Sequence, residues 1–134
     1  MRICYILLSP TWGMHQYAAD LANRRHAARD EVFLVTTSLA QRDLYHRGVA
    51  VHAPVRLRDS GFSPQGVLRL AAASQLGREI VRLRPDVVHF AGPHLWNPIL
   101  MHRLHKAGVP TVHTLHDLHP HLGAVYGRLL YLWN

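Results

Sequence analysis

The residues best suited to chemistry are four histidines in the twelve-residue stretch VHTLHDLHPHLG, from Val112 to Gly123. An imidazole can bind a metal ion, exchange a proton near neutral pH or hydrogen-bond to a ligand. His116, His119 and His121 are close enough in sequence to suggest zinc ligands, but an intervening proline and the lack of a fourth local ligand argue against a closed tetrahedral site. The spacing leaves three alternatives open: a metal site, solvated loop histidines, or the rim of an active site.

The strand predicted at the start of this stretch places its histidines on different faces of the sheet. Thr111–Leu115 is predicted to be a strand, with His113 inside it and His116 at its tip. Because side chains alternate between the two faces of a strand, residues three positions apart point to opposite faces. We therefore expect His113 to pack against the sheet, on the face away from His116. The later histidines, His119 and His121, are expected to be solvated or to cap a helix.

The rest of the chain alternates between two hydrophobic patterns, one typical of strands and one of helices. Short apolar runs bounded by turn residues predict strands at Ile3–Leu8, Val32–Thr36, Val49–His52, Asp86–Phe90 and Thr111–Leu115. Apolar positions three and four apart predict helices at Met14–Ala22, Leu39–His46, Pro64–Leu83, Leu95–Lys106 and Leu122–Trp133. This alternation implies right-handed crossovers and an open parallel sheet with helices on both faces. The predicted fold class is α/β, a doubly wound, Rossmann-like parallel sheet with strand order 3-2-1-4-5.

In a doubly wound sheet, ligands bind beyond the carboxyl ends of the strands, where the strand order reverses. Here the reversal lies between the first and fourth strands, so the loops Ser9–His15, Ala91–Trp96 and His116–His121 are expected to form the site. Gly13 precedes a helix whose free N–H groups and dipole can hold a phosphate; a simple turn at the helix start is the alternative. The sequence contains neither G-x-G-x-x-G nor a P-loop, which argues against an ordinary NAD domain and a P-loop nucleotide site.

Five other side chains have a ligand-binding or a structural interpretation. His94 follows the fourth strand and is a candidate acceptor contact, with a structural role at the helix start as its alternative. His15 would add a donor at the phosphate end of the first helix, or face solvent. Arg56 and Arg58 lie in a long loop and are candidate contacts for an anionic acceptor or a lipid headgroup. His89, within the fourth strand, is expected to be a hydrogen-bonded core histidine.

The length and composition of the chain limit the kinds of protein it can be. With 134 residues, 49% hydrophobic and 17% charged, the chain can bury a core and form one domain. The formal net charge of +7 suits an anionic partner such as a phosphorylated ligand or an anionic membrane surface. Nucleic acid is not expected, because no RNA-binding signature, zinc-finger spacing or basic zipper is present. The single cysteine, Cys4, lies in an apolar run, which favours a core role in the reducing cytoplasm.

Three segments carry a family resemblance: SPTWGMHQYAADLA, RPDVVHFAGPHLW and GVPTVHTLHDLHPH. In order and spacing they resemble the retaining glycosyltransferases of family GT4, which have the GT-B fold, and the likeness extends over essentially the whole chain. The third segment is the most specific, because it combines Gly-Val-Pro, a strand and Thr-x-His-Asp. The resemblance implies the amino-terminal, acceptor-side half of a two-Rossmann enzyme that moves a sugar from a nucleotide-diphosphate sugar to an acceptor.

The same resemblance assigns roles to particular residues. Trp12, Gly13 and Met14 would approach the donor diphosphate, together with His15. His116 would contact the transferred sugar and position it near the bond that breaks. Asp117 would orient that imidazole or an acceptor hydroxyl. The nucleotide sugar is then a substrate, and no resident cofactor or metal is expected.

The family's second domain, with its nucleotide pocket and paired glutamates, does not occur in these 134 residues. We expect residues 1–134 to be a truncated N-terminal domain that is inactive, or nearly so, until a donor-binding domain is supplied in cis or in trans. Its expected location is the cytoplasm, peripheral to the inner membrane face. Two alternatives stay open: a noncatalytic binding or assembly module with an interface at Leu129, Leu130, Leu132 and Trp133, and a His-rich metal-binding module.

Overall fold

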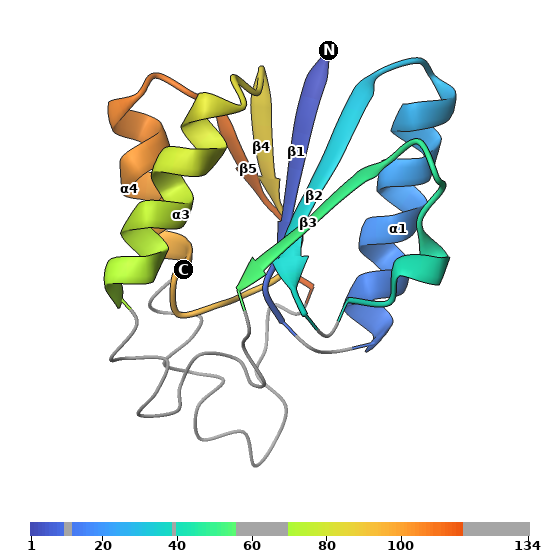
Figure 1. Ribbon diagram of the computed structural model, residues 1–134, viewed down its shortest axis with the longest axis horizontal. Coiled ribbons are helices and arrows are strands. Elements are labelled where there is room, and N and C mark those ends of the chain that lie inside the picture. Colours follow the sequence, from blue (N-terminus) through green and yellow to red (C-terminus); the bar gives the residue numbers. More distant parts are fainter. Residues whose placement is uncertain (10–11, 39, 56–69, 117–134) are drawn as a thin grey trace.

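Five parallel strands form one sheet at the centre of the protein (Figure 1). The computed structural model describes residues 1–9, 12–38, 40–55 and 70–116. The strands are β1 (Arg2–Leu7), β2 (Glu31–Thr37), β3 (Ala50–Val55), β4 (Val87–Phe90) and β5 (Thr111–His113). Their order is β3-β2-β1-β4-β5, and all neighbouring strands are parallel. The predicted fold class and strand order are confirmed.

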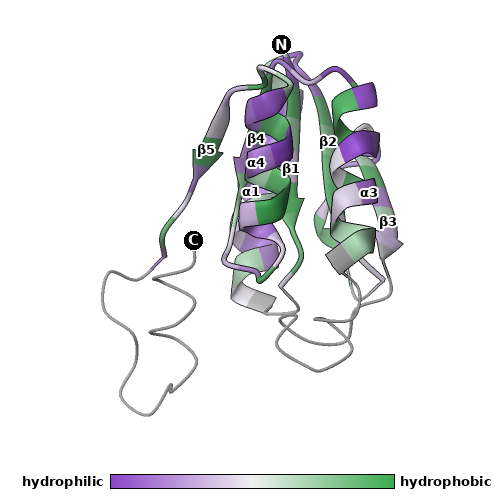
Figure 2. Cartoon of the chain, turned by 90° about the vertical axis from the view of Figure 1, so that its left-hand side faces the viewer, coloured by the Kyte–Doolittle hydropathy of each residue, from purple (hydrophilic) through white to green (hydrophobic). Residues whose placement is uncertain are grey.

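Helices cover both faces of this sheet. On one face lie α1 (Trp12–Ala27) and the short 3-10 helix η1 (Arg42–Leu44), while α3 (Leu70–Arg82) and α4 (Asn97–Lys106) lie side by side on the other (Figure 1). Figure 2 shows hydrophobic residues, in green, along the central strands, and hydrophilic residues, in purple, on the helices. The result is a three-layer arrangement in which the loops gather at the two edges where the strands begin and end.

The first strand shows why the sheet is buried on both sides. Its residues that pack with α1 are Ile3, Tyr5 and Leu7, and those that pack with α3 and α4, continuing just past the strand, are Cys4, Ile6 and Leu8. None of the six is more than 5% exposed. Because each large apolar side chain stabilises the fold by about 1.5–3 kcal/mol when fully buried, this strand anchors both layers of helices.

The helix predicted at Leu39–His46 is wrong, because the single turn η1 occupies its place; Leu39 itself lies outside the described residues. Asn23 of α1 binds backbone groups that a longer helix would use. Its Nδ2 donates to the Leu44 carbonyl at 2.9 Å, and its Oδ1 accepts from the His46 N–H at 2.7 Å. After η1 the backbone of Tyr45 is extended, with φ −99° and ψ 136°. A side chain from another helix has thus overridden the local apolar pattern.

Other boundaries differ from the predicted ones by a few residues. The third strand continues through Pro54 instead of ending at His52, which an edge strand tolerates although proline has no N–H to donate. The fourth helix begins at Asn97, and the fifth strand ends at His113. Residues 64–69 of the long predicted helix, and the helix predicted at 122–133, lie outside the described residues.

The two helices on the second face pack closely at Gly77. A Cβ built on this glycine would lie 3.1 Å from Cγ of Arg103 and 3.2 Å from its Cβ. The glycine therefore lets the aliphatic part of Arg103 cross the surface of α3, even though glycine within a helix costs about 1 kcal/mol relative to alanine. Gly77 is thus a point of close contact between α3 and α4.

Candidate functional site

The loops that follow β1, β4 and β5 meet at the carboxyl edge of the sheet. A Cβ on Gly92 would lie 2.9 Å from Sδ of Met14 and 3.2 Å from Cδ1 of Leu7, so the first turn of α1 packs directly on the backbone after β4. The N–H of Thr114 donates to the carbonyl of Phe90 at 2.9 Å, which ties the end of β5 to β4. The described residues in and beside the segments that topology predicted to form a site are therefore in contact.

His116 is anchored at this edge by one ring nitrogen. Its Nε2 lies 2.7 Å from the carbonyl oxygen of Ala91, and because a carbonyl can only accept, this nitrogen carries the hydrogen. The Tyr17 ring contacts the imidazole in a T-shaped arrangement, with centroids 4.9 Å apart and planes at 84°. In the neutral ring, Nδ1 is then an acceptor, and it has no hydrogen-bond partner within the described residues. The side chain is exposed, so this nitrogen can accept a hydrogen bond from a ligand.

A chain of hydroxyl and imidazole groups supports His116 from behind. The Tyr17 hydroxyl lies 3.1 Å from Oγ1 of Thr114, which in turn lies 2.7 Å from Nε2 of His89. The hydrogen bond predicted for His89 is thus present. Burial lowers the pKa of His89, and the nearby charges of His113 and His116 lower it further. This ring is therefore neutral at neutral pH and links α1, β4 and the end of β5.

His15, predicted to add a donor at a phosphate site, has its ring in the protein interior. It is 1% exposed, and its Nδ1 lies 3.3 Å from the hydroxyl of Tyr45. The same hydroxyl lies 3.4 Å from the His15 carbonyl oxygen, to which it donates. Burial lowers the pKa of His15, and a backbone hydrogen bond at Ser9 opposes that effect. His15 therefore joins α1 to the segment after η1, and its contact with a diphosphate stays a prediction.

The N terminus of α1 has open space around Gly13. This residue is exposed, and a Cβ built on it would meet no heavy atom within 4 Å. The first turn of the helix, which begins at Trp12, contains no acidic residue. The unpaired N–H groups and the dipole of a helix start favour an anion there, and a missing Cβ allows it to approach the backbone. These features suit the predicted diphosphate contact of Gly13.

His94 has the structural role that the sequence left open as an alternative. Its side chain is fully buried, and its Nδ1 accepts the N–H of Trp96 at 3.1 Å, just before α4 begins. Nearby, Nδ2 of buried Asn97 donates to the carbonyl of Gly92 at 2.9 Å. These bonds fix the loop that carries Gly92, and contact between His94 and an acceptor stays a prediction.

His113, the other described histidine of the VHTLHDLHPHLG stretch that the alternation sorted, lies where it was predicted. His113 is half-buried, and its ring contacts Phe90 at 6.0 Å between centroids, on the face that α3 and α4 cover. The packing role predicted for His113 is confirmed, and it lies on the face away from His116. Other predicted residues lie outside the described residues: Arg56, Arg58, Asp117, His119 and His121.

Metal ligands are the other chemistry that clustered histidines suggest. Within the described ranges, no group of three or more His, Cys, Asp or Glu side chains is arranged to hold a metal ion. Two of the three candidate ligands, His119 and His121, belong to the segment after residue 116. The metal site therefore stays an alternative.

Three residues of this site were not recognised in the sequence: Tyr17, Thr114 and Asn97. In the sequence, Tyr17 fits the apolar pattern of the first helix, although its spacing from Gly13 brings it to the same side one turn later. Thr114 directly follows β5, at the edge where a hydroxyl is well placed to meet the other loops. A search for hydroxyl and amide side chains within one turn of the predicted loops would have found all three.

Two solved structures share the fold. The C-terminal domain (residues 78–226) of the PF1911 hydrogenase from Pyrococcus furiosus superposes with a TM-score of 0.59 at 16% identity, covering 85% of this chain and 90% of that one. The glycosyltransferase VinC, solved in complex with DTDP, superposes with a TM-score of 0.55 at 15% identity. That alignment covers 84% of this chain and 34% of VinC, so the chain spans about a third of VinC. At such identities the likeness indicates a common fold alone.

Sequence comparison identifies the family. A search of curated proteins finds no significant match. The sequence profile of Glycosyltransferase Family 4 matches residues 12–134, which is nearly the whole chain and includes α1 and the segments that follow β4 and β5. The chain therefore belongs to glycosyltransferase family 4.

Proposed function

We propose that this chain is the amino-terminal, acceptor-side half of a retaining GT-B glycosyltransferase that moves a sugar from a nucleotide-diphosphate sugar to an acceptor. The observation that carries the proposal is the anchored ring of His116, beside the loops where the start of α1 packs on the end of β4. Membership of the family supports the reaction class. Catalysis then rests on positioning of the two substrates and on stabilisation of the departing diphosphate.

The donor diphosphate would lie at the N terminus of α1. Gly13 offers backbone N–H groups without a side chain in the way, and the helix dipole adds a partial positive charge. Met14, packed on Gly92, fixes the height of this turn above the sheet. Trp12 begins the helix and would flank the same position, while His15 would act through its bond to Tyr45. No resident metal or cofactor is part of the proposal.

The transferred sugar would contact His116. Because Nε2 donates to the Ala91 carbonyl, the neutral ring offers Nδ1 as an acceptor for a sugar hydroxyl. The Tyr17 ring restricts rotation of the imidazole, so the acceptor nitrogen keeps one direction. Asp117, next in the chain, is the proposed partner for an acceptor hydroxyl or for the imidazole itself. Both residues would hold reacting groups in place, which makes them positioning groups for the chemistry of the donor.

The donor nucleotide would bind a second domain, supplied in cis or in trans. The chain by itself is then proposed to be inactive or nearly so. Arg56 and Arg58 are the proposed contacts for an anionic acceptor, and for His94 we favour its structural role because the ring is fully buried.

The proposed location is the cytoplasm, at or near an anionic membrane surface. Burial raises the pKa of the Cys4 thiol and makes it an inert core residue, which fits a reducing compartment. Within the part of the chain that the structure describes, no helix is both long and apolar enough to span a bilayer. The net charge of +7 would favour attachment to acidic lipids.

Titration of the full chain, completed by a donor-binding domain, with a nucleotide-diphosphate sugar, followed by NMR, tests the proposal. We expect shifts at Gly13, Met14 and His116, and we expect His116→Ala to remove those that the sugar causes. The matched variant His105→Ala changes an exposed histidine of α4 and should leave the shifts intact. Titration with the nucleoside alone separates diphosphate and sugar contacts from contacts of the base. If no shift develops at α1 or after β5, the proposal fails and a noncatalytic binding or assembly module is favoured.

A further inference from the structure

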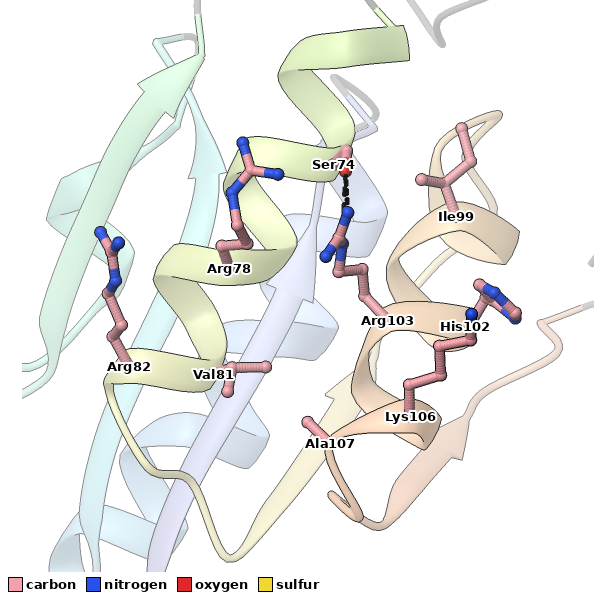
Figure 3. A pocket seen from close by; sticks show the side chains of 9 residues that line it. All are labelled: Ser74, Arg78, Val81, Arg82, Ile99, His102, Arg103, Lys106 and Ala107. Carbon is pink, nitrogen blue, oxygen red and sulfur yellow. Dashed lines mark hydrogen bonds between the residues drawn. The ribbon is translucent and has the colours of Figure 1, made fainter.

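A basic groove lies between α3 and α4, on the outer side of the helices. Its volume is about 580 Å³, and its basic side chains are Arg78, Arg82, His102, Arg103 and Lys106 (Figure 3). Among the described residues that line it there is no Asp or Glu. The groove runs toward the C-terminal ends of both helices, and in a parallel α/β fold those ends lie away from the carboxyl edge of the strands. It is therefore separate from the candidate sugar site.

The groove cations have no counter-ions in the part of the chain that the structure describes. None of the four ion pairs there involves Arg78, Arg82, Arg103 or Lys106. The nearest acid in sequence, Glu79, lines a different and smaller cavity and accepts a hydrogen bond from Gln75 at 3.1 Å. Four permanent charges thus face one groove without a neutralising carboxylate.

Arg103 is held in a fixed direction. Its Nε and Nη2 donate to Oγ of Ser74 at 3.2 and 2.6 Å, a contact drawn in Figure 3. Its aliphatic part packs at Gly77, which leaves little freedom to the stem. A guanidinium has five N–H groups, so donors remain for a ligand. Because the side chain is already ordered, less conformational entropy is lost when an anion binds.

The helix dipole accounts for the position of only some of these cations. Arg82 and Lys106 end their helices, where cations are favourable in any protein. Arg78 lies one turn before the end of α3, and Arg78 with Arg82 forms a like-charge pair four residues apart, which is unfavourable by itself. His102 and Lys106 have the same spacing on α4, so each helix presents a row of basic side chains to the groove. An anion between the rows would relieve the repulsion.

We propose that this groove binds a ligand that carries phosphate groups, either a soluble phosphorylated molecule or the headgroup of an anionic phospholipid. Arg78 and Arg103 are the principal contacts, because planar guanidinium groups match phosphate oxygens in pairs. Arg82 and Lys106 add charge at the rim. The volume is in the range of small-molecule sites, so it admits a ligand larger than a single phosphate ion. The site does not depend on the proposed transferase reaction.

Calorimetric titration of the full chain with sodium pyrophosphate tests the soluble ligand. We expect the double variant R78A/K106A to weaken binding about 100-fold, at about tenfold for each cation removed. The control R42A/R47A removes the same charge from exposed arginines in and after η1 and should change binding less than twofold. Circular dichroism of both variants verifies that they fold. The conservative variant Arg103→Lys keeps the charge but loses the fork, and it should weaken binding as well.

Sedimentation with phosphatidylcholine vesicles, with and without phosphatidylglycerol, tests the lipid headgroup. Binding that requires phosphatidylglycerol and is lost in R78A/K106A, but not in R42A/R47A, supports the proposal with a lipid as the source of phosphate. Binding of pyrophosphate with no vesicle binding supports it with a soluble ligand. If neither probe binds, or if both double variants weaken binding equally, the groove is not a phosphate site.

Discussion

The two faces of the sheet differ in whether their basic side chains are paired with carboxylates. On the α1 face, arginines near the end of the helix are paired, Arg24 with Asp20 and Arg25 with Asp30. On the other face, the cations of the α3–α4 groove have no carboxylate partner among the described residues. The site on the α1 side instead consists of an open helix start and neutral rings. The net charge of the chain is therefore a poor guide to where the sugar site lies.

Because their charges are paired differently, the two faces should respond differently to salt and to pH. Contacts between permanent charges at an exposed groove weaken as ionic strength rises, because salt screens them over about 10 Å at 0.1 M. Hydrogen bonds among buried or half-buried histidines, tyrosines and threonines respond little to salt, but they respond to protonation of the imidazoles. Salt should thus affect the groove first, and low pH should affect the α1 face first.

Replacement of His116 should have the largest effect on the α1 side. In an enzyme completed by a donor-binding domain, His116→Ala is expected to lower turnover about 100-fold, because the sugar loses its positioning contact. Steady-state transfer assays with a labelled donor measure this. The matched control His105→Ala, at an exposed position of α4, should retain full turnover. Near-normal rates in His116→Ala would remove its proposed role, whatever the groove variants do.

Replacement of two glycines at the site by alanine should change the stability of the fold in opposite directions. Gly92→Ala would set a Cβ 2.9 Å from Sδ of Met14 and 3.2 Å from Cδ1 of fully buried Leu7. We expect a loss of about 1–2 kcal/mol in the free energy of unfolding, since Met14 is flexible but Leu7 cannot move away. Gly13→Ala meets no atom within 4 Å and should stabilise the helix by about 0.5–1 kcal/mol. Urea unfolding of both variants measures the contrast, and equal effects would contradict the packing at Gly92.

The fold was predictable from the sequence because its main signals are local. The run from Ile3 to Leu8 is apolar on both faces, which only a strand between two layers of helices can bury. Right-handed crossovers then leave few strand orders. The helix predicted from Leu39 to His46 was wrong because the structure there depends on Asn23, a residue of another helix that no local pattern connects to it.

The candidate site was predictable only to the level of its loops. Topology and resemblance pointed to His116, but its anchor is a backbone carbonyl, at Ala91, which any residue type would supply. The contact between Tyr17 and Thr114 joins residues 97 positions apart, and neither side chain is unusual for its element. The sequence of each helix shows its own row of basic residues. Only the packing of α3 on α4, however, brings Arg78 and Arg103 to one cavity.

Acid should destabilise the α1 face. Burial lowers the pKa of His15 and His89 in the folded chain, while both titrate near 6.5 when unfolded. The unfolded chain therefore takes up protons first, so stability is complete above about pH 6.5 and falls as pH drops below that value toward the lower folded pKa. Urea unfolding at several pH values should show this slope, and His89→Gln should flatten it. His102→Gln, at the exposed groove, should leave the slope unchanged; a slope that persists in full without His89 would contradict its buried neutral state.

Removal of the Tyr17 hydroxyl should have the smallest effect on stability and turnover. It tests directly whether the ring or the hydroxyl of Tyr17 orients His116. Tyr17→Phe keeps the ring that contacts the imidazole but loses the 3.1 Å bond to Thr114. We expect a loss of about 0.5–1 kcal/mol in the free energy of unfolding, because the bond is only partly buried. Turnover of the completed enzyme should change less than threefold, whereas Tyr17→Ala, which removes the ring, should lower it further. If Tyr17→Phe impairs turnover as much as Tyr17→Ala, the hydroxyl and not the ring orients His116.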